Sequence, residues 1–110
     1  MRESDVNKLL TLRQNGEVDA FQQRQSFKVV LLDDDEHSYE YVIRMLNELF
    51  GYSTTDAYLM AVEVDTTGRV VVLTAPLEQA ERARDLIHRY GRDLLMPRSR
   101  GPMATILEPA

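Results

Sequence analysis

The residues of this sequence most able to do chemistry are Asp33 to His37, five consecutive side chains that read Asp-Asp-Asp-Glu-His. They directly follow an apolar run, Phe27 to Leu32, and the end of such a run does not require four neighbouring carboxylates. Ionised carboxylates accept hydrogen bonds from cationic groups, and together with a histidine they can hold a divalent metal ion. This acidic segment is therefore the first candidate for a functional site, with a cation as its ligand.

Three interpretations of this acidic segment can be compared. In the structural interpretation, which composition alone favours, the acids are solvated and start a helix, where they accept backbone N–H bonds and complement the helix dipole. A metal site is the second, but side chains of an extended chain point alternately to opposite faces, and no EF-hand or paired-histidine spacing supports it. The third is a nucleophilic triad of Asp35, His37 and Ser38, which residues so close in sequence rarely form.

The charge balance limits the partners of such a site. The chain has 110 residues, enough for one domain, with 13 Lys and Arg against 18 Asp and Glu and a formal net charge of -5. The stretch from Asp33 to Glu40 contains five acids and neither Lys nor Arg, which accounts for the whole imbalance. Nucleic acid and anionic membranes are unsuitable main partners, because both need a basic patch.

The composition excludes further classes of site. Without cysteine, the chain forms neither a disulfide nor a thiolate metal site. No apolar run approaches the roughly 18 residues of a membrane span, and the N-terminus lacks the apolar core of a signal peptide. We expect a cytoplasmic protein with a shallow surface site, since a domain of this size has little room for an enclosed cleft.

Hydrophobic periodicity predicts the elements that hold the acidic segment. Apolar β-branched runs indicate strands, apolar residues three and four apart indicate helices, and Gly or Pro marks their ends. Ser38 or Asp35 has to cap the first helix, and Ser53 the second, where a strand over Leu59–Val64 is the alternative. In chain order we predict a strand over 27–32, helices over 39–50 and 54–65, a strand over 69–74, a helix over 77–90 and a strand over 103–107.

The order β-α-α-β-α-β predicts an α/β fold, specifically an α+β sandwich in which three helices pack on a three-stranded sheet. The first strand is expected to be central and buried on most of both faces. Residues 94–102, with two prolines and a glycine, are typical of a loop. Residues 1–25 mix both charges without lasting periodicity, so we expect a flexible N-terminal extension before a domain over 26–110.

The stretch FKVVLLDDDEHSYEYVI resembles the bacterial ClpS-type adaptors of the Clp ATP-dependent proteases. In that family a strand of pattern [YF]-K-V-x-L leads into an N-D-D turn and then into T-P-M-E-F-V at the start of the first helix. The similarity continues nearly without gaps, through Phe50-Gly51-Tyr52 and Gly68-Arg69, and resumes after a longer loop at Pro102. It covers residues 27–110 and rests on the motifs in order rather than on any single one.

The resemblance implies an adaptor, not an enzyme, that needs neither cofactor nor metal. Such an adaptor binds proteins with an N-degron, a free α-amino group followed by a bulky hydrophobic first side chain, and delivers them to a Clp AAA+ ATPase. Its partners would be substrate N-termini and the N-terminal domain of the ATPase, with no nucleic acid and no membrane. The alternative is a regulatory protein that binds the Clp ATPase but whose diverged pocket does not read the usual N-degrons.

The resemblance also assigns residues to this site, position by position. Asp33 and Asp34 stand in the family's turn and Asp65 stands in place of its histidine ligand of the amine, so three carboxylates would gather there. Amine recognition would then be more strongly electrostatic, or a divalent cation or doubly cationic N-terminus would be favoured. Glu78 falls where the family contacts the ATPase. The implied substrate-binding residues are Asp33, Asp34, His37, Tyr39 in place of the gate methionine, Val42, Ala61, Val64, Asp65 and Met103.

Overall fold

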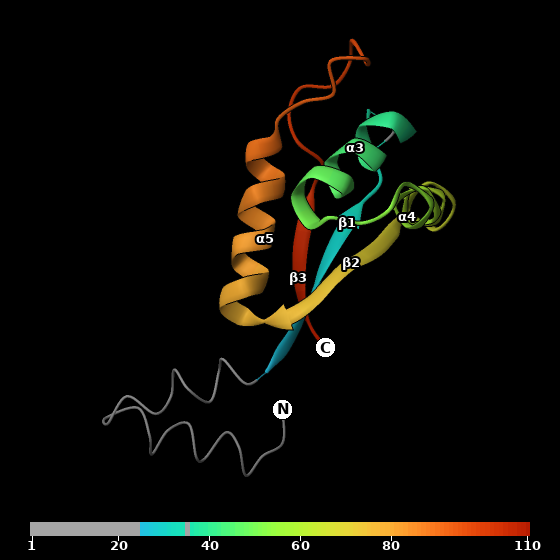
Figure 1. Cartoon of the computed structure of the whole chain (residues 1–110). Helices are drawn as coiled ribbons and strands as arrows, with labels where there is room; N and C mark the ends of the chain where they lie inside the picture. Colours follow the sequence, from blue (N-terminus) through green and yellow to red (C-terminus); the bar gives the residue numbers. More distant parts are fainter. Residues whose placement is uncertain (1–24, 35) are drawn as a thin grey trace, which may run out of the picture.

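The computed structural model describes residues 25–34 and 36–110 and contains three strands and three helices (Figure 1). Their order, β-α-α-β-α-β, confirms the predicted α+β sandwich. Of the predicted extension over residues 1–25, only Gln25 lies within the described residues, so the domain boundary stays a prediction. The elements are β1 (Ser26–Leu32), α3 (Tyr39–Phe50), α4 (Thr54–Thr67), β2 (Arg69–Pro76), α5 (Leu77–Tyr90) and β3 (Thr105–Pro109).

The strand β1 lies at the centre of the sheet, as its composition predicts. The strand order is β2-β1-β3, and β1 is antiparallel to both neighbours. Val29, Val30 and Leu31 are fully buried, so both faces of this strand are covered. A bulge between Val29 and Val30 shifts the register with β2, a feature that the hydrophobic pattern does not signal.

Each strand differs from the prediction by one or two residues at one or both ends, and α4 continues to Thr67 rather than ending at residue 65. Pairing with β1 explains two of these differences. β2 continues to Pro76, since Pro76 pairs with Ser26 at the start of β1. β3 begins at Thr105 rather than at residue 103, because β1 ends at Leu32 and the ladder starts with the pair Leu31 and Thr105. Met103 therefore precedes the strand, although its side chain is buried in the core.

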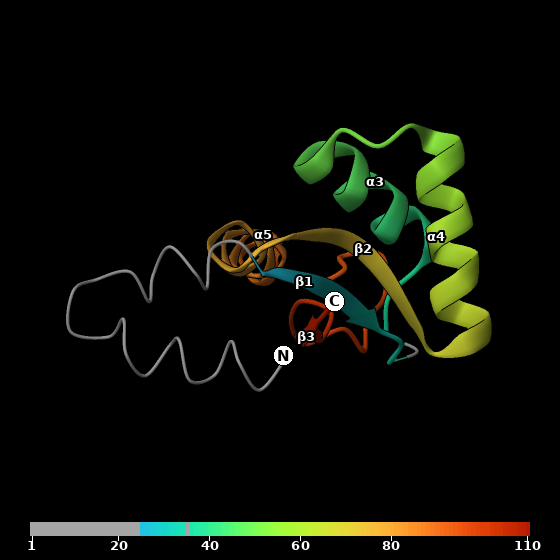
Figure 2. The same ribbon diagram turned by 90° about the horizontal axis from the view of Figure 1, so that it is seen from below.

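The helices share one hydrophobic core with β1 and β2. Val29 and Leu31 of β1 and Val70 and Val72 of β2 belong to the same buried cluster as the inner faces of α3, α4 and α5. In Figure 2, α3 lies between α5 and α4. The helix predicted after Ser53 is confirmed over the strand alternative for this segment.

The helix ends follow from capping chemistry. Ser53 accepts a hydrogen bond from the backbone N–H of Asp56 at 3.1 Å, which starts α4. Gly68, with φ of 88°, ends that helix in the left-handed conformation that a side chain would strain. The turn at Gly68 brings the chain back beside β1, because the backbone N–H of Asp33 donates to the Gly68 carbonyl at 3.0 Å. The acidic segment thus begins next to the end of α4.

Candidate functional site

Asp34 and His37 form a contact that organises the turn between β1 and α3. The Oδ1 atom of Asp34 accepts from the backbone N–H of Glu36 at 3.0 Å and lies 2.8 Å from Nδ1 of His37. The other ring nitrogen of His37 lies 2.9 Å from the carbonyl oxygen of Gly101. The ring can donate to both oxygens only as an imidazolium. The His37 side chain is 2% exposed while that of Asp34 stays partly open to solvent, so Asp34 faces outward with His37 behind it.

Ser38 is the cap of α3, which decides between the two candidates from the sequence. Its Oγ atom accepts from the backbone N–H of Tyr41 at 3.1 Å. Asp35, the other candidate and the acid of the triad hypothesis, lies outside the described residues. With the Ser38 hydroxyl engaged as a cap and the His37 ring turned toward Asp34 and Gly101, these side chains are not arranged as nucleophile and base.

Asp93 is a buried carboxylate that the sequence analysis missed. It is 2% exposed, and its oxygens accept from the backbone N–H groups of Ser38 at 2.6 Å and Leu95 at 2.9 Å. Burial by itself would raise the pKa of Asp93, but these hydrogen bonds and the nearby His37 outweigh it and hold the pKa below its ordinary value. The only sequence signal is that Asp93 is the single acid among the arginines of residues 92–100.

Ser99 adds a further link between the segment of residues 91–102 and the acidic segment Asp33–His37, which is called the acidic turn from here on. Its hydroxyl accepts from the backbone N–H of Asp93 at 2.8 Å and lies 3.3 Å from Nε2 of His37. Asp93 and His37 thus each join the two segments, one through Ser38 and the other through Gly101. The acidic turn is held from behind by a loop far away in sequence.

Tyr39 and Asp65 meet where the turn faces the end of α4. The Tyr39 hydroxyl donates to Oδ2 of Asp65 at 2.6 Å. This hydrogen bond is the largest cause of a rise in the pKa of Tyr39 to about 12, followed by burial and by the charges of Asp65 and of Asp33. The phenol therefore remains a donor at neutral pH. The structure brings Asp33, Tyr39 and Asp65 into one neighbourhood, whereas the contacts of Asp34 are with Glu36 and His37.

The four apolar residues assigned to the socket are all part of the buried core cluster. They come from α3, from α4 and from the segment before β3. Tyr39 stands one turn before Val42 on the same face of α3. Each socket residue is 3% exposed or less, so little of the socket surface is open to solvent. The four are Val42, Ala61, Val64 and Met103.

Glu78 lies apart from these residues. It is in the first turn of α5, is exposed and accepts from Arg82 at 3.2 Å. Pro76, just before this helix, pairs with Ser26 at the start of β1, whereas the acidic turn follows the end of that strand (Figure 1). The predicted partner contact and the predicted substrate site are thus at opposite ends of the sheet.

Two further possibilities can be judged over the described residues. Within residues 25–34 and 36–110, no group of three His, Cys, Asp or Glu side chains could hold a metal ion. In the same part of the chain, no helix has the length and apolar character needed to cross a membrane.

The family of the chain follows from a comparison with known proteins. The model of the family described as "ATP-dependent Clp protease adaptor protein ClpS" matches residues 22–97, which is more than half of the chain. The chain belongs to the ClpS family. The ClpS adaptor of Salmonella arizonae is 28% identical over 75 residues, covering 68% of this chain and 71% of the relative. That of Cronobacter sakazakii is 30% identical over 67 residues, covering 61% and 63%.

A solved structure agrees with the ClpS fold. Agrobacterium tumefaciens ClpS2, bound to L-phenylalaninamide, superposes with a TM-score of 0.61 at 24% identity. The similarity covers 78% of this chain and 98% of that one. The prediction of a Clp protease adaptor is therefore confirmed at the level of family and fold. ClpS proteins serve the Clp protease as adaptors for its ATPase and substrates rather than as catalysts.

Proposed function

We propose that this ClpS-family adaptor binds N-degrons, reading a free α-amino group and a bulky hydrophobic first side chain, and delivers their proteins to a Clp AAA+ ATPase. The proposal is supported by Asp33 and Asp65, two carboxylates close to Tyr39, which stands one turn before the socket residue Val42 on α3. An α-ammonium has three N–H donors, and ionised Asp33, Asp34 and Asp65 are pure acceptors. The ligand of the Agrobacterium ClpS2 structure, L-phenylalaninamide, pairs an amino group with an apolar ring and supports this proposal.

The expected affinity follows from few contacts. Burying a Phe or Leu side chain contributes about 1.5–3 kcal/mol. Each hydrogen bond between an ammonium and a carboxylate adds about 1.5–3 kcal/mol. A micromolar complex needs a binding free energy of roughly 8 kcal/mol. Two or three such contributions reach that value only if binding immobilises few side chains and little backbone. The contacts of Asp34 with Glu36 and His37 pre-order that acceptor.

Delivery would use Glu78 and the start of α5 as the contact with the N-terminal domain of the ATPase. Because the substrate site lies at the other end of the sheet, one adaptor could hold both partners at once (Figure 1). Residues 1–25 are the segment that would engage the ATPase during delivery.

Calorimetric titration with a Phe-initiated peptide and with its N-acetylated form tests the amine site. Acetylation removes the charge and two of the three N–H donors, so we expect binding to fall by at least about 100-fold, the equivalent of two lost charged hydrogen bonds. Equal binding of both peptides would overturn the proposal. A series that varies only the first residue then defines the preferred side chain.

A second candidate function is supported by the closed state of the socket. Its walls are almost completely buried, and Tyr39 is hydrogen-bonded to Asp65. A protein that binds the Clp ATPase for regulation without reading N-degrons would keep such a pocket closed. If this second function is correct, peptides with different first residues bind equally weakly and acetylation of the amine changes nothing. The complex with the N-terminal domain of the ATPase still forms.

Replacement of Tyr39 by phenylalanine is expected to strengthen binding of the Phe-initiated peptide about three- to tenfold. The substitution keeps the ring but removes a hydrogen bond that competes with the ammonium for Oδ2 of Asp65, a competition worth about 0.5–1.5 kcal/mol between exposed groups. Calorimetry measures the change. Tyr58→Phe is the matched control, since the Tyr58 ring lies 6.0 Å from that of Tyr39 and is exposed. Unchanged or weaker binding by the Tyr39 variant would show that its hydroxyl does not compete with the ligand.

A further inference from the structure

A cavity of about 470 Å³ lies between α3, the end of α5 and the segment that follows α5, and its lining residue Asp93 joins it to the acidic turn through Ser38. Tyr41 and Tyr90 line it, with ring centroids 5.5 Å apart in an edge-on arrangement. Arg44 of α3 and Arg92 of the following segment also line it. Its volume falls within the usual range of ligand pockets.

The acceptors of this cavity are already engaged within the protein. Glu48 accepts from the hydroxyl of Tyr90 at 2.8 Å. The oxygens of Asp93 accept from the backbone N–H groups of Ser38 and Leu95. A positively charged ligand would have to break internal hydrogen bonds to bind Asp93, and Tyr90 already occupies one of the two oxygens of Glu48.

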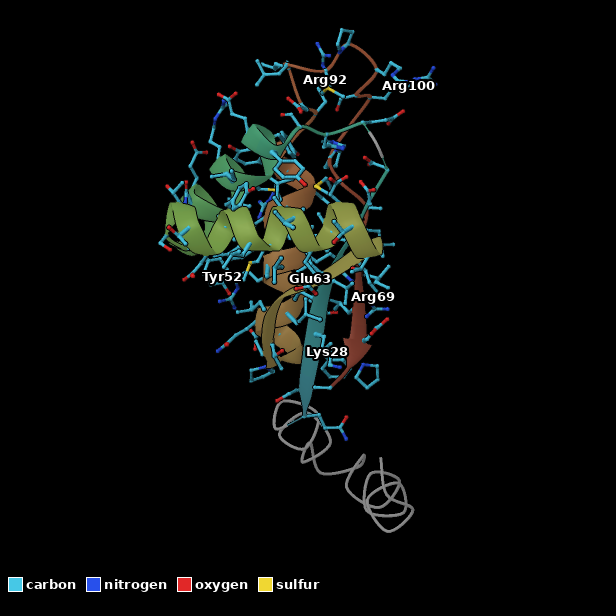
Figure 3. All side chains as sticks on the ribbon, turned by 90° about the vertical axis from the view of Figure 1, so that its right-hand side faces the viewer. Lys28, Tyr52, Glu63, Arg69, Arg92 and Arg100 are labelled. Atoms are coloured by element: carbon cyan, nitrogen blue, oxygen red, sulfur yellow. The ribbon has the colours of Figure 1, made fainter. Side chains whose placement is uncertain are left out.

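Donors, by contrast, remain available. Arg44 contacts Glu40 at 3.4 Å between exposed side chains, a geometry worth little in water. Arg92 is exposed and has no ion-pair partner among the residues that the structure describes (Figure 3). Each guanidinium presents five N–H donors that match a carboxylate in pairs. The polar part of a fitting ligand is thus an anionic acceptor.

The apolar part of the ligand is indicated by two leucines. Leu94 is 79% exposed and Leu95 is 54% exposed, and both line the cavity. Adjacent exposed leucines beside arginine and tyrosine give a composition that is typical of a protein interface.

The surrounding charge is opposite to that of the acidic turn. Residues 88–100 contain the four arginines Arg89, Arg92, Arg98 and Arg100 and a single acid, Asp93, which is buried. Figure 3 shows Arg92 and Arg100 on this loop at one end of the molecule. This cationic end would attract an acidic surface and speed its association.

We propose that this cavity is a docking site for an acidic segment of a partner protein in which a leucine or phenylalanine accompanies a glutamate or aspartate. The carboxylate would pair with Arg92 and Arg44, and the apolar side chain would cover Leu94 and Leu95. The ligand differs from that of the proposed amine site, because it needs no free α-amino group.

Fluorescence anisotropy on the full chain tests the proposal with a labelled, N-acetylated peptide of alternating glutamates and leucines. Saturable binding is expected, and Arg92→Gln is expected to weaken it about tenfold, as for one lost charged pair. Arg100→Gln is the matched control, because Arg100 is on the same loop but does not line the cavity; about a twofold change at most is expected. Leu94→Ser should weaken binding as well.

Three outcomes would overturn the proposal. The first is equal binding of a peptide with lysines in place of the glutamates. The second is an equal effect of Arg92→Gln and Arg100→Gln, which would indicate attraction to loop charge alone. The third is saturable binding of decanoate without binding of the peptide, which would make the cavity a site for small carboxylates. Because the peptides are acetylated, loss of N-degron binding would not alter any of these results.

Discussion

Replacement of Asp34 by asparagine is expected to weaken binding of a Phe-initiated peptide about 10- to 100-fold, with little loss of stability. The asparagine Oδ1 atom can still accept from the backbone of Glu36 and from His37, so the turn keeps its shape. The charge that attracts the ammonium disappears, and a hydrogen bond to a charged partner is worth about 1.5–3 kcal/mol. Calorimetry gives the affinity, and thermal unfolding shows that the fold is intact.

Glu36→Gln is the control for this prediction, because it removes one negative charge from the same turn. The contact of Glu36 with Asp34 runs through its backbone N–H, which the substitution leaves in place. We expect about a twofold change or less in affinity, the size of a screened charge effect. If both variants weaken binding equally, recognition depends on the total charge of the turn and not on Asp34. If the Asp34 variant binds as tightly as the unaltered protein, the amine does not bind at this carboxylate.

Replacement of Asp93 by alanine is expected to lower the free energy of unfolding by about 2–4 kcal/mol. The backbone N–H groups of Ser38 and Leu95 would lose their buried acceptor at partly buried positions, where each orphaned donor costs about 1–2 kcal/mol. Urea denaturation measures the change. Asp85→Ala, at an exposed residue of α5 whose contact with Arg84 is 3.4 Å long, is the control and should change stability by about 0.5 kcal/mol or less. If both substitutions lower the free energy of unfolding equally, the hydrogen bonds of Asp93 to Ser38 and Leu95 do not stabilise the fold as proposed.

The stabilisation by Asp93 is also expected to depend on pH. Because the folded state holds the pKa of Asp93 below its ordinary value of 3.8, the contribution is complete above that value and is lost as pH falls through the lower folded pKa. The gap in stability between the unaltered protein and Asp93→Ala should therefore be constant near neutral pH and shrink in acid. A gap that grows in acid would contradict this assignment.

The elements of the fold could be predicted because each leaves a local signal. The apolar run of β1 and the stripe of α5 are periodic over a few residues, and Ser53 and Gly68 mark the ends of α4 by their own chemistry. Boundaries such as the start of β3 could not be predicted. They depend on where the partner strand ends, which is a property of the pair.

The candidate site also has features that the sequence predicts and features that depend on the tertiary structure. The sequence by itself determined that an acidic turn follows a central strand, that this turn carries the net charge of the chain, and that the chain resembles the ClpS adaptors. Only the tertiary structure decided that Asp93 bonds Ser38, that His37 lies between Asp34 and Gly101, and that Tyr39 donates to Asp65. The long-range contacts among these join residues 26 to 64 positions apart. Aspartate, histidine and tyrosine side chains can each form hydrogen bonds with many groups. Which group lies within reach depends on how the helices pack against one another and against the loop of residues 91–102.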